Sequence, residues 1–72
     1  MYGMYGFVTT SGSMYVLDTK KKVIEGGKLA HPYPYKKATI MIGDKAEIII
    51  VDNEKEVTLR TSKVKNYIGG VI

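Results

Sequence analysis

Short runs of β-branched and aromatic residues alternate along this chain with polar stretches rich in Gly, Asp and Lys. Runs of this length, bounded by turn residues, are typical of β-strands. The pattern predicts an all-β fold, a single small antiparallel barrel or sandwich of five to seven short strands, formed by one domain over residues 1–72. The predicted strands are 6–10, 13–18, 23–25, 38–42, 47–51 and 56–61.

Polar turns and one proline-containing loop separate these strands. Asp18 begins the turn 18–21, where its carboxylate can accept hydrogen bonds from nearby backbone N–H groups. A second polar turn is expected over 52–55. The stretch 27–37 contains His-Pro-Tyr-Pro-Tyr, and each proline lacks an N–H and favours an extended predecessor. We therefore expect an ordered loop there, in a locally polyproline-II-like conformation.

Two predicted strands differ in how apolar and polar residues alternate. In 56–61 the apolar Val57 and Leu59 alternate with polar residues, which predicts one buried and one solvated face. The run 48–51, Ile-Ile-Ile-Val, does not alternate. Both faces of that strand are therefore expected to be buried, either because it is central in the sheet or because it contacts another subunit.

Residues 62–68 fit two local structures. Ser62 could cap a short helical turn that stops at Gly69. Alternatively, Val64, Asn66 and Ile68 could share one face of a last strand. The strand is preferred, because a single helical turn gains little from cooperativity.

The chain opens on a doubled Met-Tyr-Gly triplet at 1–3 and 4–6. Residues three apart in an extended chain point to opposite faces, so Tyr2 and Tyr5 cannot form one stripe. We expect a bulged edge strand with one tyrosine buried and the other exposed, and glycines that let another backbone approach closely. Because an apolar, uncharged edge invites pairing, this segment is expected to pair with 67–72 or with another subunit.

Length and composition limit what can stabilise the fold. The chain has 72 residues and no cysteine, so it has neither disulfides nor thiolate metal ligands. A domain of this size has a small core, and oligomerisation is the remaining way to bury more surface. Together with the run 48–51 and the apolar ends, this predicts a homo-oligomer, with an isologous dimer as the default symmetry.

The same features bear on the compartment. The absence of cysteine fits a reducing environment, and the N-terminus lacks a charged leader followed by an apolar segment. The longest apolar runs, 40–42 and 48–51, are too short to cross a bilayer. We therefore expect a cytoplasmic protein without membrane association.

Candidates for catalysis are few. His31, the only histidine, lies in the proline-containing loop and is distant in sequence from Asp18, Asp44 and Asp52. Ser11 and Ser13 have no evident base to activate them. The pattern predicts a protein that is not an enzyme and has no metal site or cofactor.

Charge points instead to an anionic partner. Eleven Lys and Arg against seven Asp and Glu give a net charge of +4. The stretch 9–13 holds four hydroxyl groups around Gly12 and predicts either an anion-binding concavity or a hydrogen-bonded turn. The stretch 60–63, Arg-Thr-Ser-Lys, suits phosphate, or else protects an edge strand. The lysine run 20–22 has two interpretations: its charges keep the protein soluble, or they form further contacts with phosphates.

The stretch 33–37, Tyr-Pro-Tyr-Lys-Lys, is the most suggestive. Tyr33 and Tyr35 beside two lysines form a plausible platform on which a base could stack. The same residues fit a protein-binding loop, because tyrosine is favoured at interfaces. A third interpretation is that both rings fold back over an open end of the barrel.

These observations predict a non-catalytic protein that binds an anionic ligand, either a nucleic acid or a nucleotide-like small molecule. Tyrosines would stack on a base, and Lys, Arg, Ser and Thr side chains would contact phosphates. The alternatives are a protein-interaction module, such as a small inhibitor or adaptor encoded by a phage or other mobile element, and a structural homo-oligomer. The candidate ligand-binding residues are Tyr33, Tyr35, Lys36, Lys37, Arg60, Thr61, Ser62, Lys63, Thr10, Ser11 and Ser13.

Overall fold

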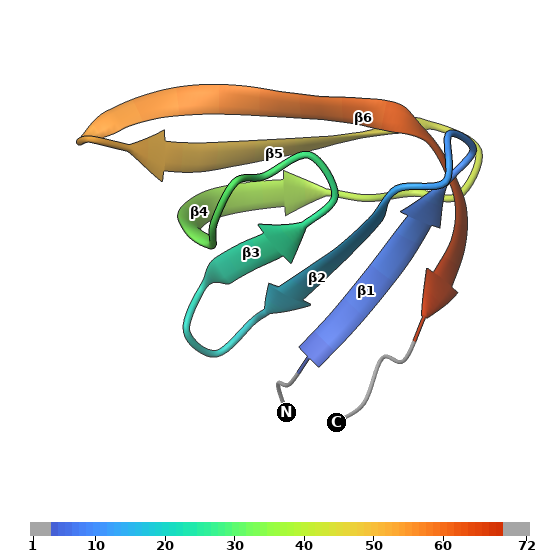
Figure 1. Cartoon of the computed structure of the whole chain (residues 1–72), viewed down its shortest axis with the longest axis horizontal. Helices are drawn as coiled ribbons and strands as arrows, with labels where there is room; N and C mark the ends of the chain where they lie inside the picture. The colour runs from blue at the N-terminus through green and yellow to red at the C-terminus, as the bar shows by residue number, and fades with distance from the viewer. Residues whose placement is uncertain (1–3, 69–72) are drawn as a thin grey trace.

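The computed structural model describes residues 4–68, which form six antiparallel β-strands and no helix. Each strand pairs with the next along the chain, and the last returns to the first, so the sheet closes into a barrel (Figure 1). The predicted all-β fold with five to seven antiparallel strands is confirmed. The strands are β1 (Met4–Thr9), β2 (Met14–Asp18), β3 (Val23–Gly26), β4 (Tyr33–Thr39), β5 (Lys45–Asp52) and β6 (Lys55–Ile68).

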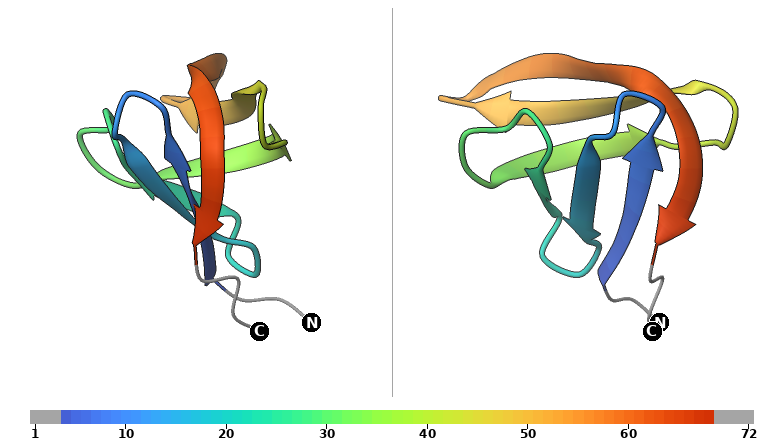
Figure 2. Two further views of the ribbon diagram at one scale, coloured as in Figure 1. Left: turned by 90° about the vertical axis from the view of Figure 1, so that its right-hand side faces the viewer. Right: turned by 45° about the vertical axis from the view of Figure 1, so that its right-hand side comes forward.

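The long strand β6 closes the barrel. It pairs with β5 from Lys55 to Lys63 and with β1 from Val64 to Ile68, and it bends between the two pairings (Figure 2). Thr61 and Val64 are both buried although they are three residues apart, and the register with β5 shifts at this point. Both observations mark a β-bulge. The preferred strand over 62–68 is therefore confirmed.

The core follows the alternation of side chains along the strands. The rings of Phe7 and Tyr15, from the neighbouring strands β1 and β2, stack with centroids 5.3 Å apart. Strand β5 adds three inward side chains at every second position. The buried apolar residues are Phe7, Tyr15, Leu17, Ile24, Tyr35, Ala46, Ile48, Ile50 and Val64.

The predicted loop over 27–37 is wrong in its second half. Strand β4 begins at Tyr33 and ends at Thr39, whereas the sequence predicted a strand over 38–42. Pro34 fits in this strand because the N–H of Tyr35 points to the β3 side, where it donates to the Lys22 carbonyl at 2.9 Å. Adjacent residues of a strand direct their backbone nitrogens to opposite sides, so the nitrogen of Pro34 faces the β5 side. The pairing of β4 with β5 begins only at Tyr35, so the missing N–H of Pro34 removes no hydrogen bond between these strands.

The expectation that both faces of the run 48–51 are buried is also wrong. Ile48 and Ile50 are 0% and 6% exposed, whereas Ile49 and Val51 are only half-buried. Strand β5 lies between β4 and β6 in the sheet, which agrees with the central position that the sequence analysis offered as one explanation of this run. Its second face, however, is the outer surface of the barrel.

The alternation predicted for 56–61 holds for Leu59 but not for Val57. Leu59 is half-buried and packs against the core. Val57 is 45% exposed, because the tip of the β5–β6 hairpin extends beyond the barrel (Figure 1).

Strand β1 is not an edge strand, contrary to the prediction. It pairs with β2 on one side and with β6 on the other, where Phe7 is opposite Tyr67. Pairing with the C-terminal segment is thus confirmed for 67–68. Gly6 permits a close approach of backbones, since a Cβ there would lie 2.9 Å from the Tyr15 carbonyl oxygen. Tyr5 is half-buried, and Tyr2 and 69–72 lie outside the described residues.

Candidate functional site

A pocket of about 410 Å³ lies at the end of the barrel where β1 begins and β2 ends. Volumes of about 300 to 1,000 Å³ are usual for small-molecule sites. Its walls come from β1, β2, the turn after β2, and β4. None of the described residues that line it is acidic. The lining residues are Tyr5, Leu17, Thr19, Lys22, Tyr35, Lys36, Lys37 and Ala38.

A β-bulge in β4 places two lysines beside a buried tyrosine. Tyr35 is opposite the buried Ile50, whereas Lys37 is opposite the half-buried Ile49, so Lys36 is the extra residue. Without the bulge, Tyr35 and Lys37 would share one face of the strand. With it, Tyr35 enters the core while both lysines remain exposed at the pocket.

The three lysines of the pocket differ in their partners. Lys36 Nζ lies 2.6 Å from a carboxylate oxygen of Glu56 on β6, in an exposed ion pair. Lys22 Nζ lies over the Tyr35 ring, 5.9 Å from its centroid, at the range of a cation–π contact. Within residues 4–68, neither Lys22 nor Lys37 forms an ion pair. These two ammonium groups are therefore available to an anion.

The two tyrosines of the pocket have perturbed hydroxyl groups. Burial raises the pKa of Tyr5, and the nearby Tyr67 and Tyr35 raise it further. Burial also raises the pKa of Tyr35, with a contribution from the Asp18 carboxylate. Both phenols are therefore protonated at neutral pH, where an O–H group can donate a hydrogen bond to an anion.

The raised pKa of Tyr5 predicts a loss of stability in alkali. Where the folded state holds a proton that the unfolded state has lost, the free energy of unfolding falls as pH rises. The contribution is complete below the ordinary pKa of 10.0 and disappears as pH rises through the raised pKa. Tyr5→Phe removes this titration, so urea unfolding between about pH 8 and 11 should show a shallower decline. An unchanged decline in Tyr5→Phe would contradict this account.

Of the predicted aromatic platform, Tyr35, Lys36 and Lys37 line the pocket, and Tyr33 does not. The Tyr33 ring lies against His31, with ring centroids 4.2 Å apart. Tyr35 is 8% exposed, so its ring forms a wall of the pocket rather than an exposed stacking surface. The second ring at the pocket is that of Tyr5, so the two tyrosines brought together are not the two that are close in sequence.

Thr10, Ser11 and Ser13 lie at the turn between β1 and β2, and none of them lines the pocket. The Thr9 N–H donates to the Ser13 carbonyl at 2.9 Å, and the Thr9 and Ser11 hydroxyl oxygens are 3.0 Å apart. These bonds form the hydrogen-bonded turn that the sequence analysis gave, for the stretch 9–13, as the alternative to an anion-binding concavity. The Thr10 N–H donates to the Lys63 carbonyl at 2.9 Å, so the two hydroxyl-rich stretches are adjacent.

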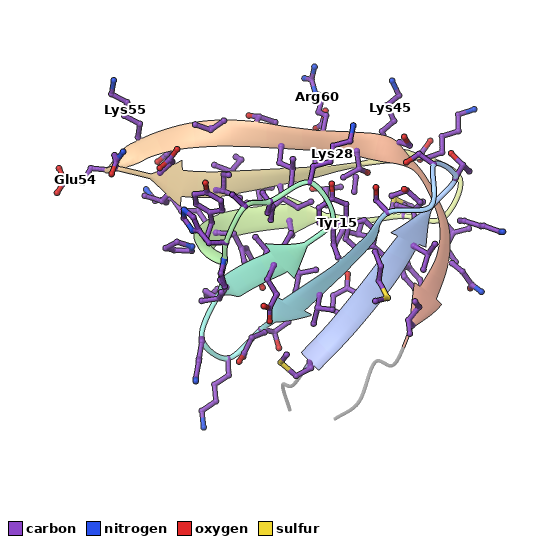
Figure 3. The ribbon with its side chains drawn as sticks, viewed as in Figure 1. Tyr15, Lys28, Lys45, Glu54, Lys55 and Arg60 are labelled. Carbon is purple, nitrogen blue, oxygen red and sulfur yellow. The ribbon has the colours of Figure 1, made fainter. Side chains whose placement is uncertain are left out.

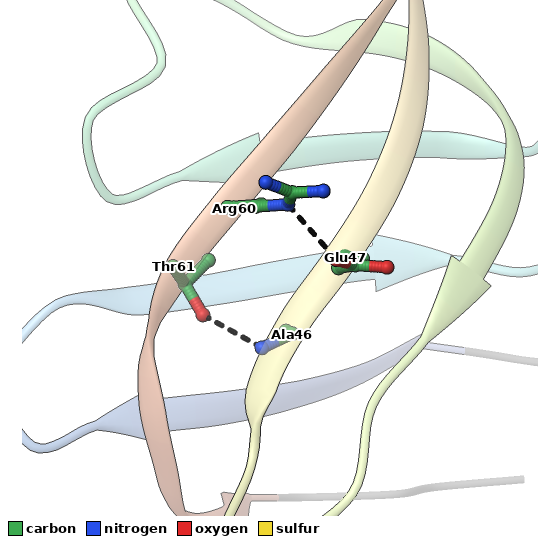
Figure 4. A network of polar contacts seen from close by, with 4 residues as sticks. All are labelled: Ala46, Glu47, Arg60 and Thr61. Atoms are coloured by element: carbon green, nitrogen blue, oxygen red, sulfur yellow. Dashed lines mark hydrogen bonds and ion pairs between the residues drawn. The ribbon is translucent and has the colours of Figure 1, made fainter.

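The stretch 60–63 lies on β6 and does not line the pocket. Arg60 Nε donates to a Glu47 carboxylate oxygen at 2.9 Å (Figure 4). Because of the bulge in β6, Arg60 and Lys63 are both exposed while Thr61 is buried. Ser62, in the bulge, is half-buried. Arg60 and Lys37 line a second, smaller pocket of about 160 Å³, whose other residues include Glu47 and Thr58. The candidate residues thus divide among the first pocket, this second pocket and the region around the turn 10–13.

Thr61 has a structural role at the bulge, and its replacement should be costly. Its Oγ1 accepts a hydrogen bond from the Ala46 N–H at 3.1 Å (Figure 4). The same hydroxyl group donates to the Ser62 carbonyl at 2.7 Å. Thr61→Val keeps the shape but leaves the buried Ala46 N–H without its acceptor. We expect a loss of about 1 to 3 kcal/mol in the free energy of unfolding, measured in urea. Thr61→Ser keeps the hydroxyl and should retain more stability, and the reverse order would contradict this role.

Tyr5 and Lys22 line the pocket but were not among the predicted site residues. Lys22 belongs to the lysine run 20–22, so a signal was present in the sequence. What the sequence does not show is that Val23 pairs with Pro34, which brings this turn to β4. Tyr5 reaches the same pocket through β1, which pairs with β2.

Comparison of this chain with protein-family models, curated proteins and solved structures finds no match. Among residues 4–68, no group of three or more His, Cys, Asp or Glu side chains is placed to hold a metal ion. The same part of the chain contains no helix long and apolar enough to cross a membrane.

Proposed function

We propose that the protein binds a small phosphate-containing ligand of nucleotide size in the pocket between Tyr5, Tyr35, Lys22 and Lys37. The observation that carries the proposal is an open pocket of about 410 Å³ whose charged lining residues are all lysines. A volume in this range suits a single small molecule better than a polymer. The protein acts by binding, without a chemical step.

The lining separates into groups that suit the two parts of such a ligand. Ammonium groups of Lys22 and Lys37 and the phenol O–H groups donate hydrogen bonds to phosphate oxygens, and the lysines add charge attraction. Ala38 and the Tyr5 ring, both half-buried, offer apolar surface against which a flat base can pack. No carboxylate lines the described pocket, although Glu56 pairs with the lining residue Lys36 and Asp18 lies close enough to raise the pKa of Tyr35.

Calorimetric titration with ATP at low salt tests the proposal. We expect a dissociation constant below about 100 μM for the unmodified chain and a loss of about tenfold or more in the double variant Lys22→Ala/Lys37→Ala. The matched controls are Lys65→Ala and Lys55→Ala, combined in one chain. These residues are exposed on β6 and do not line the pocket, so the same charge is removed elsewhere.

Two further titrants separate the alternatives. Adenosine lacks the phosphates and should bind far more weakly than ATP. A thymidine oligonucleotide that binds more tightly than ATP, with a steep dependence on salt, would place a polymer on the outer surface instead. If neither ATP nor the oligonucleotide binds below about 100 μM, the anionic ligand is excluded, and a protein partner becomes the remaining binding function.

A further inference from the structure

The first half of β6 has one unpaired side. Strand β5 occupies one side of β6 from Lys55 to Lys63, whereas β1 reaches the other side only from Val64 onward. No other described strand pairs with 55–62. A strand edge of this kind presents free N–H and C=O groups and is a ready surface for pairing with another strand.

Side chains along this edge divide between two faces. Glu56, Thr58 and Arg60 are exposed on the outer face, and Arg60 points away from the barrel in Figure 3. Val57 and Leu59 lie on the face that continues the core. Val57 is 45% exposed, so the apolar face remains uncovered toward the hairpin tip.

The segment 56–60, Glu-Val-Thr-Leu-Arg, is complementary to itself in antiparallel pairing. A two-fold axis at Thr58 places Glu56 opposite the partner's Arg60 and Val57 opposite the partner's Leu59. Directly opposite residues share a face, so the charged pairs meet on the outer face and the apolar pairs on the inner face. Opposite charges and Thr–Thr pairs are favourable at such positions, and the Val57–Leu59 pairs bury apolar surface.

We propose that this edge of β6 is the interface of an isologous dimer, in which two copies of the chain pair antiparallel about Thr58. The proposal goes beyond the ligand pocket and does not depend on it. The register centred on Leu59 would place Lys55 opposite the partner's Lys63 and lose both ion pairs. The register centred on Val57 would pair Arg60 with the partner's Glu54, which lies in the turn before β6.

Existing ion pairs extend this complementarity. Glu56 already contacts Lys36, and Arg60 already contacts Glu47. In the dimer, side-chain charges of alternating sign follow one another across the interface, in the order Lys36, Glu56, the partner's Arg60 and the partner's Glu47. A network of charges contributes more than isolated exposed pairs do. The closed symmetry also leaves no further β6 edge for a third copy.

Sedimentation equilibrium of the full chain tests the interface. The chain has a mass of 8.0 kDa, so a dimer has twice this mass, about 16 kDa. We expect the dimer to predominate at about 100 μM and to dissociate on dilution. Thr58→Lys places like charges directly opposite one another and should weaken the dimer at least about tenfold. The matched control is Met14→Lys, which adds the same charge to an exposed position on β2, a strand that does not pair with β6, and should leave the dimer intact.

A charge exchange gives a second, independent test. Glu56→Arg and Arg60→Glu should each weaken the dimer at least about tenfold. The two combined should give a tighter dimer than either single variant, because the charge pairs across the interface are restored, but a weaker one than the unmodified chain, because the exchanged charges now lie beside Lys36 and Glu47. Circular dichroism of each variant checks that the barrel is folded. If sedimentation gives the monomer mass of 8.0 kDa for the unmodified chain at every concentration, the proposal is overturned. So would a dimer that none of these changes weakens, because its interface would then lie elsewhere.

Discussion

Gly27→Ala is expected to lower the free energy of unfolding by about 3 to 5 kcal/mol. A Cβ at Gly27 would lie 2.2 Å from Cζ and 2.3 Å from Cε1 of Tyr15. The Tyr15 ring is 1% exposed and its hydroxyl accepts a hydrogen bond from the Lys28 N–H at 3.4 Å (Figure 3). It therefore cannot move aside without opening the core. The positive φ of 56° at Gly27 adds a smaller backbone cost.

Gly12→Ala is the matched control for this change. Gly12 also has a positive φ, of 92°, but an added Cβ would meet no atom within 4 Å. Its replacement should therefore cost only the backbone strain, about 1 to 2 kcal/mol. Urea unfolding of both variants compares the two costs. Equal losses would contradict the claim that contact with Tyr15 dominates at Gly27.

Ile48→Ala is expected to cost about 2 to 5 kcal/mol in the free energy of unfolding, whereas Ile49→Ala should cost about 1 kcal/mol or less. Ile48 is 0% exposed among the core side chains, so its truncation leaves a cavity. Ile49 is the next residue of the same strand, with the same side chain, but it lies half-buried on the outer face. The difference therefore measures the alternation of β5 directly. Similar losses for both would indicate that the outer face is covered in solution, as a second subunit on this face would require.

Most strands could be predicted from the sequence because alternation and turn residues are local signals. The polar turn at 18–21 is an example, since the Asp18 carboxylate accepts hydrogen bonds from the N–H groups of Lys20 and Lys21, both at 3.0 Å. The start of β4 could not be predicted, because two prolines normally argue against a strand. Pro34 is tolerated only where β4 changes partners, and that depends on tertiary pairing.

The candidate site could be predicted only in part. The stretch 33–37 supplied Tyr35, Lys36 and Lys37, which are close in sequence and share the pocket. Tyr5 and Lys22 come from other strands and turns, and their approach follows from the closure of the barrel. Tyr33, which the sequence analysis groups with Tyr35 because both lie beside two lysines, does not line the pocket, and its ring lies against His31.

Amide chemical shifts can show whether a phosphate-containing ligand binds in the lysine-lined pocket. A titration of the ¹⁵N-labelled chain with ATP locates the bound molecule without any substitution. We expect the largest shifts at Lys22, Tyr35 and Lys37, with little change at Thr10 and Ser11 in the turn between β1 and β2. Shifts confined to the turn 10–13 and to 60–63, or no shifts at millimolar ATP, would contradict binding in this pocket.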